Sequence, residues 1–278
     1  MRARRPGPGG NDGGDATILG QVRHLAERFA PRILWRHRIR TWHISTEEPE
    51  QELLPWACDR RQLSLDVGAA QGTYLAHLLL YSAGVIAFEP RPEAAGRLRA
   101  QFGGTAHTRL EQVALSDASG TAEIRIPAQR PMRGTIAPSN LLQGAREVQS
   151  HTVPCARLDD YRLAPVGFIK IDVEGHERAV LAGARDTVGR NRPIALVEAE
   201  ERHSAGSVAG VARFFQEFDC NGYFLLEGRL RPIAEFDAAA HQDSSHLSDG
   251  RRTGVYINNF LFVPHTKLQR IPGHYLSR

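Results

Sequence analysis

The segment Leu63-Ser64-Leu65-Asp66-Val67-Gly68-Ala69-Ala70-Gln71-Gly72-Thr73-Tyr74 begins as a short apolar run, breaks at glycines and continues with helix-compatible residues. A second apolar run follows, Val85-Ile86-Ala87-Phe88, and Glu89 closes it. A buried strand that ends in an acid, turns on glycines and continues as a helix can hold a nucleoside against backbone N–H groups. The two runs therefore predict a nucleoside site, and glycines that merely turn a strand into a helix are the alternative.

The position of the first acid favours one nucleoside over another. Nicotinamide dehydrogenases favour G-x-G-x-x-G, with an acid about 20 residues further on that binds the ribose. Here Asp66 stands at the strand end itself and the pattern is Gly68-x-Ala70-x-Gly72. That acid suits S-adenosylmethionine, which carries a charged amino group and no pyrophosphate. Glu89 can accept the ribose hydroxyls with either cofactor.

Composition limits the classes of function. The 278 residues suffice for one large domain with extensions. The net charge is +4, and almost all of the positively charged residues are arginines. No stripe of arginines alternates with aromatic residues as a nucleic-acid binder requires. Three widely spaced cysteines without a C-x-x-C pair, no secretory signal and no apolar stretch of about 20 residues predict a cytoplasmic protein without a membrane span.

The N-terminal part is expected to lie outside the catalytic domain. Residues 1–15 are rich in glycine, arginine and proline and predict a disordered tail. Residues 16–61 predict a helical extension, in which Ile18, Val22, Leu25 and Phe29 recur at helical spacing and a second short helix covers 50–58. The first helix packs on its own domain or, alternatively, lies on a membrane surface.

From Leu63 onward, buried strands alternate with amphipathic helices, which predicts an α/β fold with a mostly parallel sheet covered on both faces. We expect helices from Thr73 to about Gly84, from Pro92, across 180–188 and across 211–218. Seven strands are expected, at 63–67, 85–88, 110–115, 168–173, 194–197, 223–226 and 259–263.

The alternation breaks between the third and fourth of these strands. Short strands at 121–126 and 151–155 flank residues 127–150, which predict a lid or substrate loop on the cofactor side. The domain is thus expected to span 62–265, with a C-terminal tail at 266–278.

A second cluster of polar residues follows the fourth strand, in Lys170-Ile171-Asp172-Val173-Glu174-Gly175-His176-Glu177. In a doubly wound sheet this strand lies beside the first, so Asp172 is expected to face the same crevice as Gly68. An alcohol that attacks a sulfonium methyl group must lose its proton, and a carboxylate or imidazole would assist. Asp172, Glu174 and His176 are therefore the candidate catalytic residues.

Several of these polar residues also have a purely structural interpretation. Glu177 is expected to satisfy N–H groups at a helix start rather than to do chemistry. His176 is alternatively a solvated helix-start residue, and Lys170 is a candidate partner of the acids. Glu198, Glu200 and His203 follow the fifth strand and offer oxygen ligands for magnesium, although solvated acids are the default and a divalent metal is not favoured.

With these motifs in view, the chain resembles the FkbM-type S-adenosylmethionine-dependent methyltransferases over roughly residues 50 to 265. The resemblance rests on six motifs in order. They are Asp66-Val67-Gly68-Ala69-Ala70-Gln71-Gly72-Thr73-Tyr74, Phe88-Glu89-Pro90, Ala114-Leu115-Ser116-Asp117, Arg157-Leu158-Asp159-Asp160, Lys170 to Glu177, and Asn259-Phe260-Leu261-Phe262.

The resemblance implies a seven-stranded, Rossmann-like class I methyltransferase fold whose last strand is antiparallel. It also implies roles: Asp66, Gly68 and Gly72 cradle the methionine part of the cofactor, Glu89 binds the ribose, and the neighbourhood of Ala114 holds the adenine. Asp172 and Glu174 border the methyl group and the acceptor. Ala70 stands where the family usually has asparagine, so one side chain able to hydrogen-bond near the cofactor is missing.

An O-methyltransferase acting on a sugar, a polyketide or another secondary metabolite is the function that the resemblance implies. A non-catalytic binding or assembly module with the same fold is the first alternative, which the change at Ala70 leaves open. A nicotinamide-dependent dehydrogenase is the second, and the placement of Asp66 counts against it.

Overall fold

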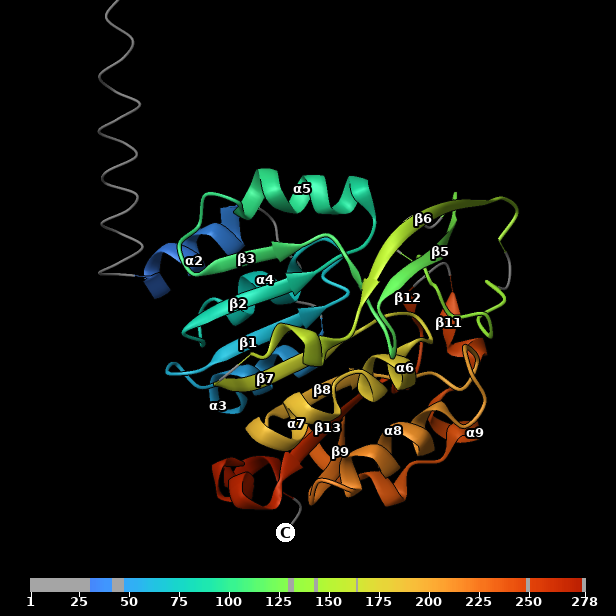
Figure 1. Cartoon of the computed structure of the whole chain (residues 1–278). Helices are drawn as coiled ribbons and strands as arrows, with labels where there is room; N and C mark the ends of the chain where they lie inside the picture. The colour runs from blue at the N-terminus through green and yellow to red at the C-terminus, as the bar shows by residue number, and fades with distance from the viewer. Residues whose placement is uncertain are drawn as a thin grey trace, which may run out of the picture.

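A central eight-stranded sheet organises the structure, a computed structural model that describes residues 31–41, 48–129, 133–142, 145–163, 165–248 and 251–276. The strand order is β10-β9-β13-β8-β7-β1-β2-β3 (Figure 1). The strands are β1 (Leu63–Val67), β2 (Gly84–Phe88), β3 (Thr108–Glu111), β7 (Val166–Ile171), β8 (Ile194–Glu198), β9 (Cys220–Leu226), β10 (Arg229–Pro232) and β13 (Asn259–Pro264).

The topology is that of a mostly parallel sheet with a reversed strand near one edge. β3, β2, β1, β7 and β8 pair in parallel. β13, the last strand of the sheet in chain order, runs antiparallel to β8 and β9. The Rossmann-like class and the antiparallel last strand are therefore confirmed, and β1 lies beside β7 as expected.

The predicted count of seven strands is wrong by one, because β10 adds an eighth strand at the edge. It pairs antiparallel with β9 through a two-residue turn, in which Glu227 and Gly228 both have positive φ, +51° and +72°. This is the tight hairpin geometry that suits the twist of the strands. Two arginines and a proline fill β10, and such residues are tolerated at a sheet edge but do not produce a strand pattern.

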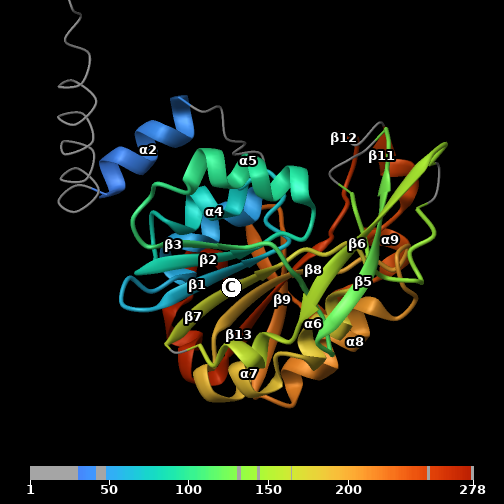
Figure 2. The same cartoon turned by 45° about the horizontal axis from the view of Figure 1, so that its top comes forward.

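Helices cover both faces of the sheet. On one face lie α2 (Pro31–Thr41), α3 (Leu54–Ala57), α4 (Thr73–Leu78) and α5 (Pro92–Phe102), and on the other α6 (Glu177–Ala182), α7 (Arg185–Asn191) and α8 (Ser207–Gln216) (Figures 1 and 2). Successive residues of β7 face opposite sides: Phe168 joins one hydrophobic core, while Ile169 and Ile171 join the other.

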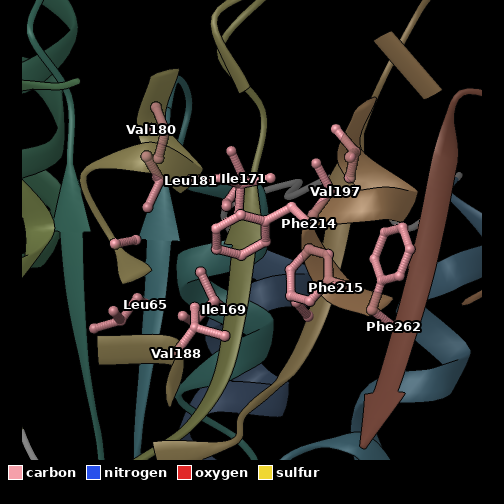
Figure 3. Packing of buried hydrophobic residues seen from close by; sticks show 14 of the residues in the cluster. Leu65, Ile169, Ile171, Val180, Leu181, Val188, Val197, Phe214, Phe215 and Phe262 are labelled. Atoms are coloured by element: carbon pink, nitrogen blue, oxygen red, sulfur yellow. The ribbon is translucent and has the colours of Figure 1, made fainter. Parts of the chain in front are cut away.

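The second of these cores packs β1, β7 and β8 against α6, α7 and α8 (Figure 3). Phe215 of α8 stacks on Phe262 of β13 with ring centroids 4.3 Å apart, and Val180 and Val188 fill the space above β7. Both faces of the parallel strands are thus buried, which explains why these strands read as continuous apolar runs.

Three predicted elements differ in detail. The strand expected at 110–115 is split, because the chain leaves the main sheet after β3 and enters a small sheet as β4 (Ala114–Leu115). The helix expected across 180–188 is broken into α6 and α7 at Gly183, where a Cβ atom would lie 2.0 Å from the main-chain oxygen of Ser116. The helix α4 ends at Leu78, short of Gly84.

The small sheet has the order β4-β6-β5 and carries the segment predicted as a lid. β5 (Gly120–Pro127) and β6 (Val148–Ala156) form an antiparallel pair. Figures 1 and 2 both show it projecting beyond the carboxyl ends of β1 and β7. This position brings residues 133–142 next to the crevice where the cofactor is expected.

The remaining elements are short. They are the 3-10 helices η1 (Pro49–Leu53), η2 (Leu158–Tyr161), η3 (Ile233–Glu235), η4 (Ser244–His246), η5 (His265–Arg270) and η6 (Gly273–Tyr275), the helix α9 (Ala238–His241), and the strands β11 (Leu247–Ser248) and β12 (Arg251–Arg252). The short helix predicted at 50–58 corresponds to η1 and α3. Residues of the predicted C-terminal tail pack against it, since Tyr275 is buried and donates to the main-chain oxygen of Glu52.

The predicted tail at 1–15 and the helix at 18–29 lie outside the described residues. Among the helices that are described, none is both long enough and apolar enough to cross a bilayer.

Candidate active site

A cavity of about 270 Å³ opens at the carboxyl ends of β1, β2 and β7. Eight of the nine predicted site residues line it: Asp66, Gly68, Ala70, Glu89, Ala114, Asp172, Glu174 and His176. The ninth, Gly72, is not part of the wall. Its φ of +80° closes the turn, and a Cβ atom there would meet the Phe102 ring of α5 at 2.6 Å.

Gly68 brings the two sequence motifs together. Its φ is +85°, and a Cβ atom would lie 1.8 Å from the main-chain oxygen of Asp172. The N–H of Asp172 in turn donates to the oxygen of Val67 at 2.9 Å. Only glycine permits this approach, so the glycine turn after β1 and the acidic turn after β7 form one wall of the cavity.

Asp66 presents to the cavity a carboxylate with one oxygen, Oδ2, that has no partner among the described residues. The residue is 2% exposed, and its Oδ2 atom has no hydrogen-bond partner among the described residues. Burial raises the pKa of Asp66 to about 7, against the opposing effect of Lys170. A buried acceptor without a partner is costly, and a cationic ligand in the cavity would satisfy it.

Ala70 adopts a left-handed backbone conformation with φ +50°. Asparagine tolerates this region better than alanine does, which gives a conformational reason for the residue that the resemblance implies here. The N–H of Ala70 donates to Glu89 Oε2 at 2.9 Å.

Glu89 already has protein partners on both carboxylate oxygens. Arg91 donates to Oε1 from Nε at 2.8 Å and to Oε2 from Nη2 at 2.9 Å, and both residues are buried. Arg91 also lines the cavity. A ribose could therefore bind Glu89 only by displacing one of these donors, and this competition was not foreseen from the sequence.

The acids after β7 and β8 form a linked group around Lys170. This lysine is fully buried, its Nζ lies 3.8 Å from Asp172 Oδ2, and it donates to Asn259 Oδ1 at 2.9 Å. Burial raises the pKa of Asp172, and Lys170 opposes that shift. Burial and Asp172 also raise the pKa of Glu198 well above its ordinary value. Lys170 is thus a partner of Asp172, as the sequence suggested.

Glu174 lies on a strained turn between β7 and α6. Its φ is +53°, and its main-chain oxygen accepts hydrogen bonds from Thr135 Oγ1 and Asn140 Nδ2, both at 2.8 Å. Glu177 closes the turn from the other side, because its Oε1 accepts from the N–H groups of Val173 and Gly175. The predicted structural role of Glu177 is consistent with this arrangement.

His176 is oriented by residues of the third motif, Ala114-Leu115-Ser116-Asp117. Its Nε2 lies 2.9 Å from Ser116 Oγ, which donates to Asp117 Oδ1 at 3.1 Å. Burial lowers the pKa of His176, so the imidazole is neutral at pH 7. A neutral imidazole on the cavity wall can accept a proton.

The structure places two of the three candidate metal ligands, Glu200 and His203, close together and the third, Glu198, apart from them. Glu200 and His203 come together with Glu174, and their ligand atoms lie within 4.8 Å of one another. Glu198 lies instead beside Asp172. Glu200 is bound by Arg202 at 2.5 and 2.7 Å and accepts from the hydroxyl of Tyr256, so both of its oxygens are already engaged by donors.

Several residues of the cavity were not singled out from the sequence. Glu48, Tyr74, Arg91 and Arg133 line the wall, and Tyr74 donates to Glu48 at 2.8 Å. Tyr74 belongs to the first quoted motif, and Arg133 lies in the predicted lid. Their positions in those segments are the only signal that could have identified them.

Comparison with known proteins gives three similarities. The family model described as the methyltransferase FkbM domain matches residues 66–224, more than half of the chain. A 2-O-methyltransferase NoeI from Sinorhizobium fredii is 31% identical over 147 residues, which are 47% of this chain and 60% of that protein. A crystal structure of a methyltransferase FkbM from Methylobacillus flagellatus KT is 15% identical, covers 89% of this chain and 59% of that one, and superposes with a TM-score of 0.47.

Proposed function

This chain belongs to the FkbM methyltransferase family, and we propose that it transfers a methyl group from S-adenosylmethionine to a hydroxyl oxygen of a small molecule. The relative NoeI, by its name a 2-O-methyltransferase, supports oxygen as the atom methylated. Sugars, polyketides and other secondary metabolites are the acceptor classes that we propose.

The unpartnered Oδ2 atom of the Asp66 carboxylate is the observation that carries the proposal. The ammonium group of the donor would satisfy Oδ2, which the described protein groups leave without a partner. The same cavity offers apolar contacts for an adenine ring from Val113, Leu115 and Ile124. Gly68, Ala70 and Ala114 would border the bound donor, and Glu89 would receive the ribose after Arg91 moves. The residues present therefore fit this nucleoside.

The acidic turn after β7 would act on the acceptor. When bound, the donor supplies an electrophilic methyl group. Glu174, which lines the cavity, would take the proton of an acceptor hydroxyl, and Asp172, beside Lys170, would orient the reacting groups. His176 is the second candidate base. No step in this scheme uses a metal ion.

Calorimetric titration with S-adenosylmethionine tests the first half of the proposal. We expect saturable binding to the full chain and at least tenfold weaker binding to Asp66→Asn, since a charge-assisted contact contributes about 1.5–3 kcal/mol. No heat at high donor concentration would favour a non-catalytic module with the same fold.

An assay of methyl transfer tests the second half of the proposal. The purified chain, radiolabelled donor and a metabolite extract should give a labelled product that survives in the presence of a chelator. Label on nitrogen or carbon in the product would overturn the assignment to oxygen, and loss of product with chelator would implicate a metal.

A cytoplasmic setting is also part of the proposal. Cys58, Cys155 and Cys220 are all free thiols in the structure, which suits a reducing compartment.

A further inference from the structure

The carboxylate of Glu89 accepts four hydrogen bonds, two on each oxygen. Oε1 accepts from the main-chain N–H and from Nε of Arg91, at 2.9 and 2.8 Å. Oε2 accepts from the N–H of Ala70 and from Nη2 of Arg91, both at 2.9 Å. A carboxylate has about four lone-pair positions, so these donors fill the positions at which a ligand hydroxyl would bind.

Two of the four donors are main-chain groups whose positions the local fold determines. Arg91 lies between Pro90 and Pro92, and the proline that follows it restricts it to extended conformations. It has φ −70° and ψ 122° at the start of α5. The N–H of Ala70 belongs to the turn after β1. Both N–H groups therefore stay with Glu89 when side chains move, and the Arg91 guanidinium is the part that can leave.

The guanidinium binds Glu89 in the way that a ribose would. It gives one donor to each carboxylate oxygen, from two nitrogens of a planar fork. The two vicinal hydroxyls of a ribose can also give one donor to each oxygen. When the guanidinium leaves, one lone pair on Oε1 and one on Oε2 become open, so the two hydroxyls can replace the two nitrogens one for one.

This replacement is costly because the ion pair is buried. The side chains of Arg91 and Glu89 are 8% and 3% exposed. Breaking a buried pair leaves charges that neutral hydroxyls compensate only in part. The segment predicted as a lid also covers the Arg91 side chain, since a Cβ atom on Gly134 would lie 3.1 Å from its Cδ. A nucleoside must therefore offset both the lost ion pair and the movement of a packed side chain.

We propose that Arg91 is a positioning residue that acts through Glu89, an internal competitor that lowers the affinity for the methyl donor and for its demethylated product alike. This inference rests on the proposed function. Donor and product share one nucleoside, so the return of Arg91 to Glu89 assists release of the product after transfer. Product release limits the turnover of many enzymes, and Arg91 acts on that step without contact to the reacting atoms.

Calorimetric titration of the full chain with S-adenosylhomocysteine tests the competition. Arg91→Met removes both side-chain donors, and we expect about tenfold tighter binding because charge-assisted hydrogen bonds to Glu89 no longer have to be broken. Arg91→Lys keeps the charge without the fork and should have an intermediate affinity. The exposed Arg97 of α5 provides the matched control, since Arg97→Met should bind as wild type. Unchanged or weaker binding in a folded Arg91→Met would overturn the proposal.

Thermal unfolding of each variant monitors the fold. If Arg91→Met does not fold, Arg91→Lys decides the question, and an affinity no higher than that of wild type would then overturn the proposal.

The 2′-deoxyribose analogue of S-adenosylhomocysteine gives a readout that a merely structural role of Arg91 would not change. In wild type the guanidinium can keep its bond to the carboxylate oxygen that lacks a hydroxyl, so the analogue should bind less than about threefold more weakly. In Arg91→Met no side chain replaces the missing hydroxyl, and the loss should be about tenfold. Equal losses in the two proteins would overturn the inference.

Failure of this inference is distinguishable from failure of the proposed function. A wild-type chain that binds neither S-adenosylmethionine nor S-adenosylhomocysteine would refute the proposed function, and the inference with it. Clear binding without the expected response of the Arg91 variants would refute the competition alone. In a crystal structure of the complex with S-adenosylhomocysteine, we expect the guanidinium away from Glu89, and retention of both of its contacts beside a bound ribose would contradict the proposal.

Discussion

Asn140 donates from its side-chain nitrogen to the main-chain oxygen of Glu174 at 2.8 Å, and so joins the predicted lid to the candidate catalytic turn. Thr135 donates to the same oxygen at the same distance. Both donors are buried, and Arg125 fixes their segment by donating to the main-chain oxygens of Ala137 and Asn140. The left-handed conformation of Glu174 is thus held by residues that precede it by more than thirty positions.

Removal of this contact should destabilise the protein. Asn140→Ala leaves a buried carbonyl with one donor fewer, so we expect the free energy of unfolding to fall by about 1–2 kcal/mol in urea titrations. The neighbouring Ser139 is exposed, and Ser139→Ala is the control that should change little. Equal stability of the two variants would show that the hydrogen bond from Asn140 to Glu174 does not contribute to the free energy of unfolding.

Donor binding should depend on pH through Asp66. The carboxylate must be ionised to hold an ammonium group, and its pKa in the free protein is raised to about 7. The affinity for S-adenosylmethionine should therefore rise between pH 6 and pH 8 in wild type and remain flat in Asp66→Asn. Calorimetry at three pH values would decide this, with the exposed surface variant Asp160→Asn following wild type. A pH-independent affinity in wild type would contradict the role of Asp66.

Ala70→Gly should stabilise the fold. Alanine at φ +50° is strained, whereas glycine adopts this region freely, so a net gain of about 0.5–1 kcal/mol is expected after the entropy cost of glycine. Ala69→Gly, one position earlier and without positive φ, should instead lose stability. Thermal unfolding of both variants measures the difference, and a destabilised Ala70→Gly would show that the strain is absent.

Glu177 should make stability decrease with rising pH. Burial raises its pKa from 4.5 to about 7, so the folded state keeps a proton that the unfolded chain releases. The free energy of unfolding therefore falls as the pH rises from about 4.5 to 7, and Glu177→Gln should lack this part of the decrease. The stability of Glu177→Gln relative to wild type should grow across that window, by up to about 3 kcal/mol.

Urea titrations of Glu177→Gln and wild type at pH 5 and pH 7.5 give this difference directly. The exposed Glu93→Gln is the control, and its difference from wild type should not change with pH. A constant difference for Glu177→Gln would mean that this carboxyl group is ionised in the folded protein throughout.

The strands and the cavity wall could be predicted because their signals are local. A parallel strand buried on both faces requires a continuous apolar run, and its carboxyl end must carry the polar groups that face the crevice. Asp66 lies at the end of such a run and Glu89 and Asp172 follow one, so their meeting at one edge follows from strand order alone. Gly68 was identifiable for a similar reason, because only glycine fits where one backbone lies against another.

The partners of these residues were decided only by the tertiary structure. Arg91 donates to the carboxylate of Glu89. Asn140 and Thr135 donate to the main-chain oxygen of Glu174, and His203 lies beside the Glu174 carboxylate. Each of these contacts joins a strand end to a loop or to a turn that has no periodicity of its own. Where a loop residue lies depends on the packing of the residues around it. For that reason the sequence supplied the acids of the site, and the folded chain determined which groups each acid contacts.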